Sequence, residues 1–459
     1  MLRPHSYVAV VLNENQIRDL TAFAEPWLRY QYVARRFPSL VAGLIVDKRT
    51  VLQAAYGHAD VESGREATAR TPYRIASHSK MLTAIAVLRL REAGLLSLED
   101  RIADWVPSAR ELGDVTVRDV LSHQGGLQRD PENGAWQTFR FPTRAQARAE
   151  SRGGVDVFPP LDRFKYSNLS FAVLGEVIER ATNQTYAQVM RDELIRPLRL
   201  RDTEPDLTDA IAPRLATGYT RDWPGEPREP FPAIDTRAYA PATGFAMSID
   251  DMCTVMRALV TEDPRLLTAR AHRELRSPIG GEYRPGLRYG LGMMSTNIAD
   301  GWVYGHGGGF PGHITRTMFD PDTRFGASVF VNAIDAPTSD ITSGLQHTAR
   351  RLAATWDEYG TPARKPRRPL THYVGTFRNE WSDVAITRCN RQLVMLALDS
   401  LLPFEEPARL EPLGGDRFRI HGGIAHGDEG EDVSFTFDRD GTCRELHVAA
   451  GTRMDPFDY

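Results

Sequence analysis

The chain has 459 residues, of which 41% are hydrophobic and 25% are charged, and its formal net charge is -4 at pH 7. One hydrophobic core rarely serves a chain of this length, so we expect two domains of unequal size. The ordinary composition excludes a disordered or fibrous protein. The slightly acidic balance provides no cationic field, which excludes a nucleic-acid partner.

The cysteines and the N-terminal segment indicate in which cellular compartment the protein is located. Cys253, Cys389 and Cys443 lie far apart and outside any zinc-ligand spacing, so we interpret them as reduced and structural. The N-terminal segment has only a short apolar run, residues 7–12, without a small-residue cleavage site. No segment approaches the roughly 20 apolar residues of a membrane span. These features predict a cytoplasmic protein that does not bind a membrane.

The first predicted elements are a helix, a hairpin and a second helix. Residues 16–25 have amphipathic spacing, and Pro26 is their expected stop. Residues 40–57 contain two apolar runs joined by polar residues and predict a β-hairpin. Helical spacing of leucine and isoleucine then predicts a mostly buried helix over residues 77–93, ended by Gly94.

The middle of the chain predicts a helical insertion followed by a return to strands. Short helices at residues 171–180 and 248–260 alternate with connections rich in proline and glycine. Strand-like runs then complete the sheet begun by the hairpin. They occupy residues 302–304, 314–319 and 327–332. A helix over residues 341–356 closes this part.

The sequence pattern changes in the C-terminal region. Short runs of alternating apolar and polar residues follow one another at intervals of about ten residues, which predicts a small antiparallel sandwich or barrel. We therefore expect a larger domain over residues 1–360, a linker rich in proline and arginine over residues 361–370, and a small barrel domain over residues 371–459.

Ser77 and Lys80 form the pattern S-x-x-K at the start of the predicted buried helix. Residues three apart on a helix share a face, so the Lys80 amine can lie beside the Ser77 hydroxyl. A serine becomes a good nucleophile when a base accepts its proton, and a lysine in an apolar wall loses charge readily enough to act as that base. The pattern alone also fits a capping serine and a surface lysine.

Tyr166 and Asn168 form Y-x-N just before a predicted helix. A tyrosine beside a lysine can share its proton and, as phenolate, can activate the water that releases an acyl group. The alternative interpretation of Y-x-N is a packed tyrosine with a capping asparagine.

His306, Gly307 and Gly308 follow the predicted strand at residues 302–304. Glycines at a strand edge let a substrate approach the backbone closely. The N–H group of the next residue, Gly309, can then pair with that of Ser77 as an oxyanion hole.

In this order and at these separations, S-x-x-K, Y-x-N and H-x-G resemble the serine β-lactamase and penicillin-binding-protein superfamily. The particular branch is that of class C β-lactamases, D-aminopeptidases, DD-peptidases and related esterases. Residues 115–127 and 243–259 also resemble segments of this branch. The resemblance implies an α/β (α+β) serine β-lactamase-like domain with an antiparallel sheet, flanking helices and a helical insertion. A small C-terminal antiparallel β-barrel of lipocalin-like type is expected to follow.

The resemblance also implies roles for the motif residues. Ser77 would be acylated, Lys80 would accept its proton, and Tyr166 would be the acid/base partner. His306 stands where class C β-lactamases have the lysine of K-T-G, which resembles D-aminopeptidases, DD-peptidases and some esterases. The implied site comprises the catalytic residues Ser77, Lys80, Tyr166 and His306 and the substrate-binding or oxyanion residues Asn168, Gly308 and Gly309.

The expected activity is hydrolysis of small amides or peptides, including those with D-residues, through an acyl-enzyme. The alternatives are a carboxylesterase, a β-lactamase, and a silent binding protein that kept the fold. No metal or organic cofactor is implied, and a homo-oligomer is an open possibility.

The acidic, glycine-rich stretch 422–432 contains Asp428 and Glu429. A solvated hairpin loop is the simplest interpretation. In the D-aminopeptidases that the chain resembles, a loop of the C-terminal barrel enters the active site, where acidic charge recognises a free α-amine. Asp428 and Glu429 are therefore candidates for recognition of a substrate amine.

Overall fold

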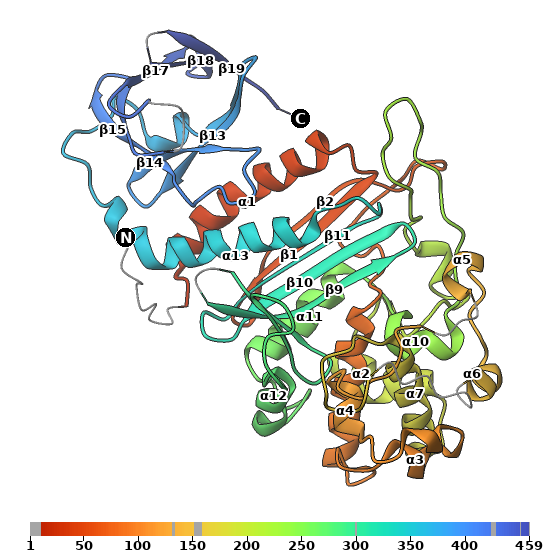
Figure 1. Ribbon diagram of the computed structural model, residues 1–459. Coiled ribbons are helices and arrows are strands. Elements are labelled where there is room, and N and C mark those ends of the chain that lie inside the picture. The colour runs from red at the N-terminus through yellow and green to blue at the C-terminus, as the bar shows by residue number, and fades with distance from the viewer. Residues whose placement is uncertain are drawn as a thin grey trace. The chain divides into compact units, whose positions relative to one another are not determined.

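The computed structural model describes residues 11–130, 134–150, 158–298, 301–423, 428–449 and 451–458, so most of the apolar run 7–12 lies outside the described residues. The chain divides into two compact units (Figure 1). The first, here called the sheet unit, is residues 37–339. The second, the barrel unit, combines residues 1–36 with residues 340–459. The expected linker at residues 361–370 stays a prediction.

An antiparallel sheet runs through the sheet unit. Its strands in the described part of the chain are β1 (Ser39–Val46), β2 (Arg49–Asp60), β3 (Arg65–Glu66), β7 (Leu287–Tyr289), β8 (Met294–Asn297), β9 (Trp302–Phe310), β10 (His313–Asp320) and β11 (Phe325–Val331). They are ordered β3-β2-β1-β11-β10-β9-β8-β7. In the pairing of β1 with β11, Leu40 lies opposite Val331 and Ala42 opposite Val329. The hairpin and the later strands therefore form one sheet, as the sequence predicts.

Helices gather around this sheet. They are α2 (His78–Glu92), α3 (Ile102–Trp105), α4 (Val117–Leu121), α5 (Ala135–Thr138), α6 (Arg144–Glu150), α7 (Asn168–Thr182), α8 (Tyr186–Met190), α9 (Arg196–Leu198), α10 (Ala240–Thr243), α11 (Ile249–Val260) and α12 (Ala269–Arg276). Short 3₁₀ helices η1 (Pro107–Leu112), η4 (Ala212–Arg214) and η5 (Arg237–Tyr239) and the π-helix η3 (Arg191–Ile195) connect them. Strands β4 (Tyr73–Arg74), β5 (Thr203–Glu204) and β6 (Ala246–Met247) form a small second sheet. No helix within the described ranges is both long enough and apolar enough to cross a membrane.

Helix α2 forms the centre of the core of the sheet unit. Its side chains Met81, Ile85 and Leu88 are fully buried, and they share one apolar cluster with Met252 of α11 and Phe330 of β11. A helix that is apolar around its whole circumference must be covered on all sides. Figure 1 shows α11 lying along β1 and β11 and α2 lying beside α7 and α10. The start of α2 is thereby held in a fixed place.

The barrel unit contains a closed antiparallel barrel. Its strands are β12 (Gly375–Arg378), β13 (Asp383–Cys389), β14 (Gln392–Ala397), β15 (Ala408–Gly414), β16 (Arg417–His421), β17 (Asp432–Phe437), β18 (Cys443–Val448) and β19 (Thr452–Pro456). Phe418 and Ile420 of β16 are buried while their neighbours along the strand are exposed. Closure leaves no free edge strand, which resolves the open choice between sandwich and barrel. The prediction of a helix-and-sheet domain followed by a C-terminal barrel is confirmed.

Helices also belong to the barrel unit. They are α1 (Glu14–Ala34), α13 (Thr338–Thr355), which begins at the boundary of the unit, and the 3₁₀ helices η6 (Trp356–Tyr359) and η7 (Leu370–His372). The prediction that Pro26 ends the first helix is wrong, because α1 continues through it. An interior proline costs about 3 kcal/mol. Burial of Trp27 and Leu28 offsets this cost, and the Trp27 indole donates a hydrogen bond to the carbonyl of Ser400 at 3.1 Å.

Strand β9 lies unusually close to the residues that precede α2. A Cβ atom added at Gly308 would lie 2.2 Å from the carbonyl oxygen of Ile75, whereas one added at Gly309 would have Ile314 Cδ1 at 3.6 Å as its nearest neighbour. We therefore expect Gly308→Ala to destabilise the sheet unit by about 1–3 kcal/mol, because backbone atoms must move to admit the methyl group. Thermal unfolding measures this effect, with Gly309→Ala as the matched control. Equal melting temperatures for the two variants would contradict the close approach.

Candidate active site

Ser77 occupies the cap position at the N-terminal end of α2. Its hydroxyl makes no capping hydrogen bond, so the interpretation of Ser77 as a capping serine does not describe this residue. The preceding residue, Ala76, has a φ of 49°, in the left-handed region that residues other than glycine rarely adopt. Such strain is typical of residues held in place for function. Ser77 remains partly exposed at this turn, while the neighbouring Ala76 and His78 are buried.

Lys80 is fully buried, one helical turn beyond Ser77. Its Nζ atom lies 3.1 Å from Oγ of Ser77, within hydrogen-bond distance. Two further oxygens contact the same nitrogen, Oδ1 of Asn168 at 2.6 Å and the carbonyl of Ala242 at 2.9 Å. Burial lowers the pKa of Lys80 well below its usual value, and the negative charge of Asp130 opposes this effect only in part. Lys80 is therefore a buried amine that loses its proton readily, and not a surface lysine.

Tyr166 lies in the loop before α7, and the centre of its ring lies 4.8 Å from the Lys80 Nζ atom. Burial raises the pKa of the Tyr166 phenol, and the contact with Ser77 lowers it by a smaller amount. A raised pKa keeps the phenol protonated near neutral pH. Activation of the deacylating water by Tyr166 as a phenolate stays a prediction.

Asn168 is the first residue of α7, but the side chain that caps this helix is that of Ser167. The Asn168 amide is instead bound on both sides. Its oxygen contacts Lys80, and its nitrogen donates to Oδ1 of Asp130 at 2.8 Å. Asp130 also accepts a hydrogen bond from the Trp136 indole at 2.8 Å. Asn168 thus orients the lysine amine, and its contact with a substrate amide stays a prediction.

His306 is a buried residue of β9. Its Nδ1 atom lies 2.6 Å from the carbonyl oxygen of Gly307, and its Nε2 atom lies 3.0 Å from the Tyr289 hydroxyl. The carbonyl requires a proton on Nδ1, so Nε2 accepts the hydrogen bond from Tyr289. Burial, followed by the nearby His78, lowers the pKa of His306 well below its usual value. A neutral imidazole therefore lies beside Tyr166, with the two ring centres 6.4 Å apart.

Gly308 and Gly309 continue β9 beyond His306. Because Gly308 nearly touches Ile75, this part of the strand lies against the turn that leads into Ser77. Pairing of the N–H groups of Gly309 and Ser77 as an oxyanion hole stays a prediction.

The fold thus brings Ser77, Lys80 and Asn168 into one hydrogen-bonded cluster, with Tyr166 and His306 next to it. Asp428 and Glu429 belong to the barrel unit, and residues 424–427 of the acidic loop lie outside the described residues. Recognition of a substrate amine by this loop stays a prediction. Within the described ranges, His, Cys, Asp and Glu side chains form no group of three or more that could hold a metal ion.

Three residues near the cluster received no role from the sequence motifs. The ring of His123 lies 4.3 Å from that of Tyr166, Tyr289 contacts His306, and Asp130 binds Asn168. For His123 a signal existed, because residues 115–127 resemble a segment of related proteins. Asp130 and Tyr289 lie outside any recognised motif, and only the folded chain shows their position.

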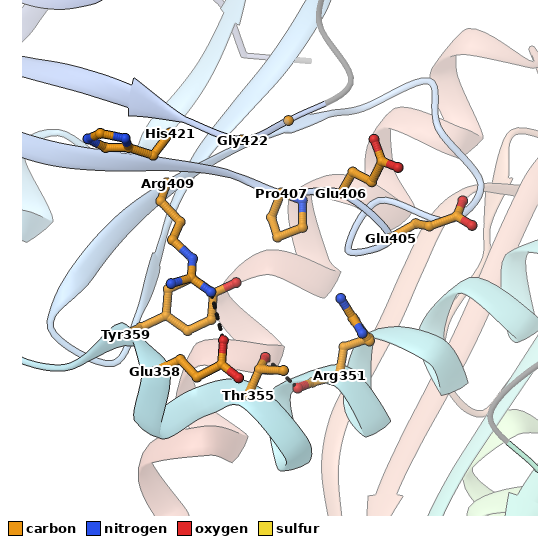
Figure 2. A pocket seen from close by; sticks show the side chains of 11 residues that line it. Arg351, Thr355, Glu358, Tyr359, Glu405, Glu406, Pro407, Arg409, His421 and Gly422 are labelled. Atoms are coloured by element: carbon orange, nitrogen blue, oxygen red, sulfur yellow. Dashed lines mark hydrogen bonds and ion pairs between the residues drawn. The ribbon is translucent and has the colours of Figure 1, made fainter. Parts of the chain in front are cut away.

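A separate pocket lies in the barrel unit, between the end of α13 and the strands β15 and β16 (Figure 2). The Arg409 guanidinium lies 4.6 Å from the centre of the Tyr359 ring and pairs with Glu358 at 2.8 Å. The Thr355 hydroxyl donates to the carbonyl of Arg351 at 2.8 Å. The side chains named here pair with one another or with the backbone, and the residues that line the pocket include no serine and no lysine.

Comparison with known proteins identifies the family of the chain. Residues 17–344 match the protein family described as Beta-lactamase. The protein named "Protein flp" of Staphylococcus aureus (strain MW2) is 24% identical over 299 residues, which are 63% of this chain and 58% of that protein. The chain thus matches less than two thirds of the length of this relative.

Solved structures share the fold. The octameric penicillin-binding protein homologue from Pyrococcus abyssi superposes with a TM-score of 0.64 at 20% identity, over 95% of this chain and 99% of that chain. A D-amino acid amidase from Ochrobactrum anthropi SV3, complexed with D-phenylalanine, superposes with a TM-score of 0.61 at 22% identity, over 73% of this chain and 99% of that chain. Likeness at these identities concerns the fold alone.

The fold, with its antiparallel sheet, helical insertion and buried S-x-x-K helix, defines the class of serine β-lactamase-like proteins. With the match over residues 17–344, the chain belongs to the Beta-lactamase family, whose members are serine hydrolases.

The lowered pKa of Lys80 leads to a prediction about pH. If the neutral amine accepts the Ser77 proton, acylation of Ser77 by a fluorophosphonate rises with pH, with a midpoint well below the usual lysine value of 10.5. An arginine stays protonated, so Lys80→Arg should acylate at least about 100-fold more slowly and lose this rise. Labelling reactions that are quenched at set times and analysed by intact-protein mass spectrometry measure the acylation rate and its dependence on pH. The melting temperature of each protein checks that it is folded. Unchanged labelling in Lys80→Arg would show that another group takes the proton.

Proposed function

We propose that the chain hydrolyses small amides or peptides, including those that contain D-amino acids, through an acyl-enzyme formed on Ser77. The observation that carries this proposal is the environment of the Lys80 nitrogen. A neutral amine has two N–H bonds and one lone pair. With the N–H bonds directed at the oxygens of Asn168 and Ala242, the lone pair faces the Ser77 hydroxyl 3.1 Å away.

Acylation then involves three linked events. Oγ of Ser77 attacks the substrate carbonyl carbon while its proton passes to Lys80. The N–H groups of Ser77 and Gly309 bind the oxyanion that develops. As the carbon–nitrogen bond breaks, Tyr166 relays a proton from the lysine side to the departing amine.

Deacylation reverses the proton path. A water molecule attacks the ester carbonyl, its proton is taken up through Tyr166 and Lys80, and the Ser77 oxygen leaves with a proton. The products are a carboxylic acid and the regenerated enzyme.

An amide substrate is favoured over a β-lactam by one residue. His306 stands in place of the lysine of K-T-G, and it is neutral because burial lowers its pKa. A neutral imidazole offers no ammonium to a substrate carboxylate. A similar fold in a D-amino acid amidase supports the same choice. A silent binding protein is less consistent with the cluster, because a buried lysine is costly to keep without use.

Location and assembly stay open within this proposal. The cytoplasmic location stays a prediction. Association into a homo-oligomer is also a prediction, supported by the similar fold of an octameric penicillin-binding protein homologue.

A substrate screen tests the proposal directly. Among D- and L-amino-acid amides, p-nitrophenyl esters and nitrocefin, we expect hydrolysis of a D-amino-acid amide with kcat/KM at least about 10-fold above its L-form and above nitrocefin. Ser77→Ala should abolish hydrolysis and fluorophosphonate labelling. Turnover of esters alone would favour the carboxylesterase. An unlabelled Ser77 under all probes would favour the binding protein.

The variant Tyr166→Phe tests whether Tyr166 donates the proton to the leaving group. An amine leaves only when it is protonated, whereas p-nitrophenolate leaves without help. We expect Tyr166→Phe to lower kcat/KM by about 100-fold or more for an amide, and by about 10-fold or less for acylation by a p-nitrophenyl ester. Steady-state and burst kinetics on both substrates provide the values. Equal losses on the two substrates would remove Tyr166 as the proton donor to the leaving group.

A further inference from the structure

The loop that carries Tyr166 lies along residues 123–129, to which no function has been assigned so far. Hydrogen bonds from main-chain and side-chain donors connect the two segments. They run from Leu161 N to the carbonyl of Gln124 (2.8 Å), from Lys165 N to that of His123 (2.8 Å), from Ser167 Oγ to that of Gln128 (2.6 Å), and from Asn168 N to that of Arg129 (2.7 Å). The Y-x-N loop therefore takes its shape from this neighbouring segment.

His123 contacts the backbone on both sides of Tyr166. Its carbonyl oxygen accepts the N–H of Lys165 at 2.8 Å, and its Nδ1 atom accepts the N–H of Ser167 at 3.2 Å. Its ring also lies against that of Tyr166, with the centres 4.3 Å apart and the planes inclined by 43°. One residue thus holds the residue before the tyrosine, the tyrosine ring, and the residue after it.

The contact with Ser167 defines the state of the imidazole. A backbone N–H only donates, so Nδ1 must carry a lone pair and the ring must be neutral. The pKa of His123 is lowered well below its usual value, first by burial and then by the neighbouring Lys80 and His306. The backbone of His123 is left-handed, with a φ of 61°. Asparagine and glycine tolerate this conformation better than most residues.

We propose that His123 is a positioning residue for acyl transfer, whose Nδ1 atom and carbonyl hold the backbone on either side of Tyr166 so that the phenol meets Ser77. This inference rests on the proposed function of Ser77 and Tyr166. His123 itself does not contact the reacting atoms. It acts through the tyrosine.

A packing role predicts different behaviour. His123 also contacts Phe164, Phe171 and Tyr289, with ring centres 5.6, 5.3 and 4.7 Å away. If only packing matters, every variant that loses the ring is equally impaired. If the Nδ1 acceptor matters, a short acceptor without a ring restores function. His123→Asn places an amide oxygen near the position of Nδ1, whereas His123→Gly has no acceptor, and both tolerate the left-handed backbone.

The experiment compares fluorophosphonate acylation and amide hydrolysis in the wild type, His123→Asn and His123→Gly. We expect His123→Gly to lower kcat and the acylation rate by about 30-fold, with KM changed by less than about 3-fold, and His123→Asn to recover to within about 3-fold of the wild type. Equal losses in both variants would overturn the proposal in favour of packing. An acylation rate in His123→Gly equal to that of the wild type would overturn it as well.

A spectroscopic measurement makes the test independent of activity. In protein labelled with [4-13C]tyrosine, Tyr166→Phe assigns the Tyr166 resonance. We expect this resonance to shift in His123→Gly and to coincide with the wild type in His123→Asn. A coinciding resonance in all three proteins overturns the inference. If the fluorophosphonate does not label Ser77 in the wild type, the proposed function fails. The comparison of Tyr166 resonances still decides whether His123 positions Tyr166.

Discussion

The removal of one amine from water is the constraint on which the site depends. Lys80 is buried in the apolar wall formed by α2 and α7, and a charged ammonium is unfavourable there. The protein provides just enough polar contact, from Asn168 and Ala242, to orient the amine without keeping it fully charged. The nearby Asp130 is held one residue away from the amine, behind Asn168. A direct ion pair would raise the lysine pKa and keep the amine protonated, so that it could not accept the serine proton.

The fold explains why these groups keep fixed positions relative to one another. The core around α2 fixes the helix, the strained turn at Ala76 exposes Ser77, and the near contact between Gly308 and Ile75 keeps β9 beside that turn. The backbone of the Y-x-N loop is held by residues 123–129, and the ring of Tyr166 also lies near His306 of β9. Three supports of different kinds therefore meet at the serine.

The sequence predicts much of this arrangement, for definable physical reasons. Apolar spacing reveals the hairpin, α2 and most barrel strands, because burial imposes a period on each element. S-x-x-K reveals Ser77 and Lys80, because one helical turn makes them neighbours. Spacing does not reveal that α1 passes through Pro26, since the compensating burial depends on distant residues. It also does not reveal Asp130 or Tyr289, because single residues become partners only when separate segments meet.

The pairing of β1 with β11 has a consequence for biosynthesis. Leu40 and Val331 are neighbours in the sheet although about 290 residues separate them in the chain. The first hairpin leaves the ribosome with one side lacking its native partner, and it must wait for nearly the whole unit to be translated. During that interval an apolar strand is open to wrong pairings.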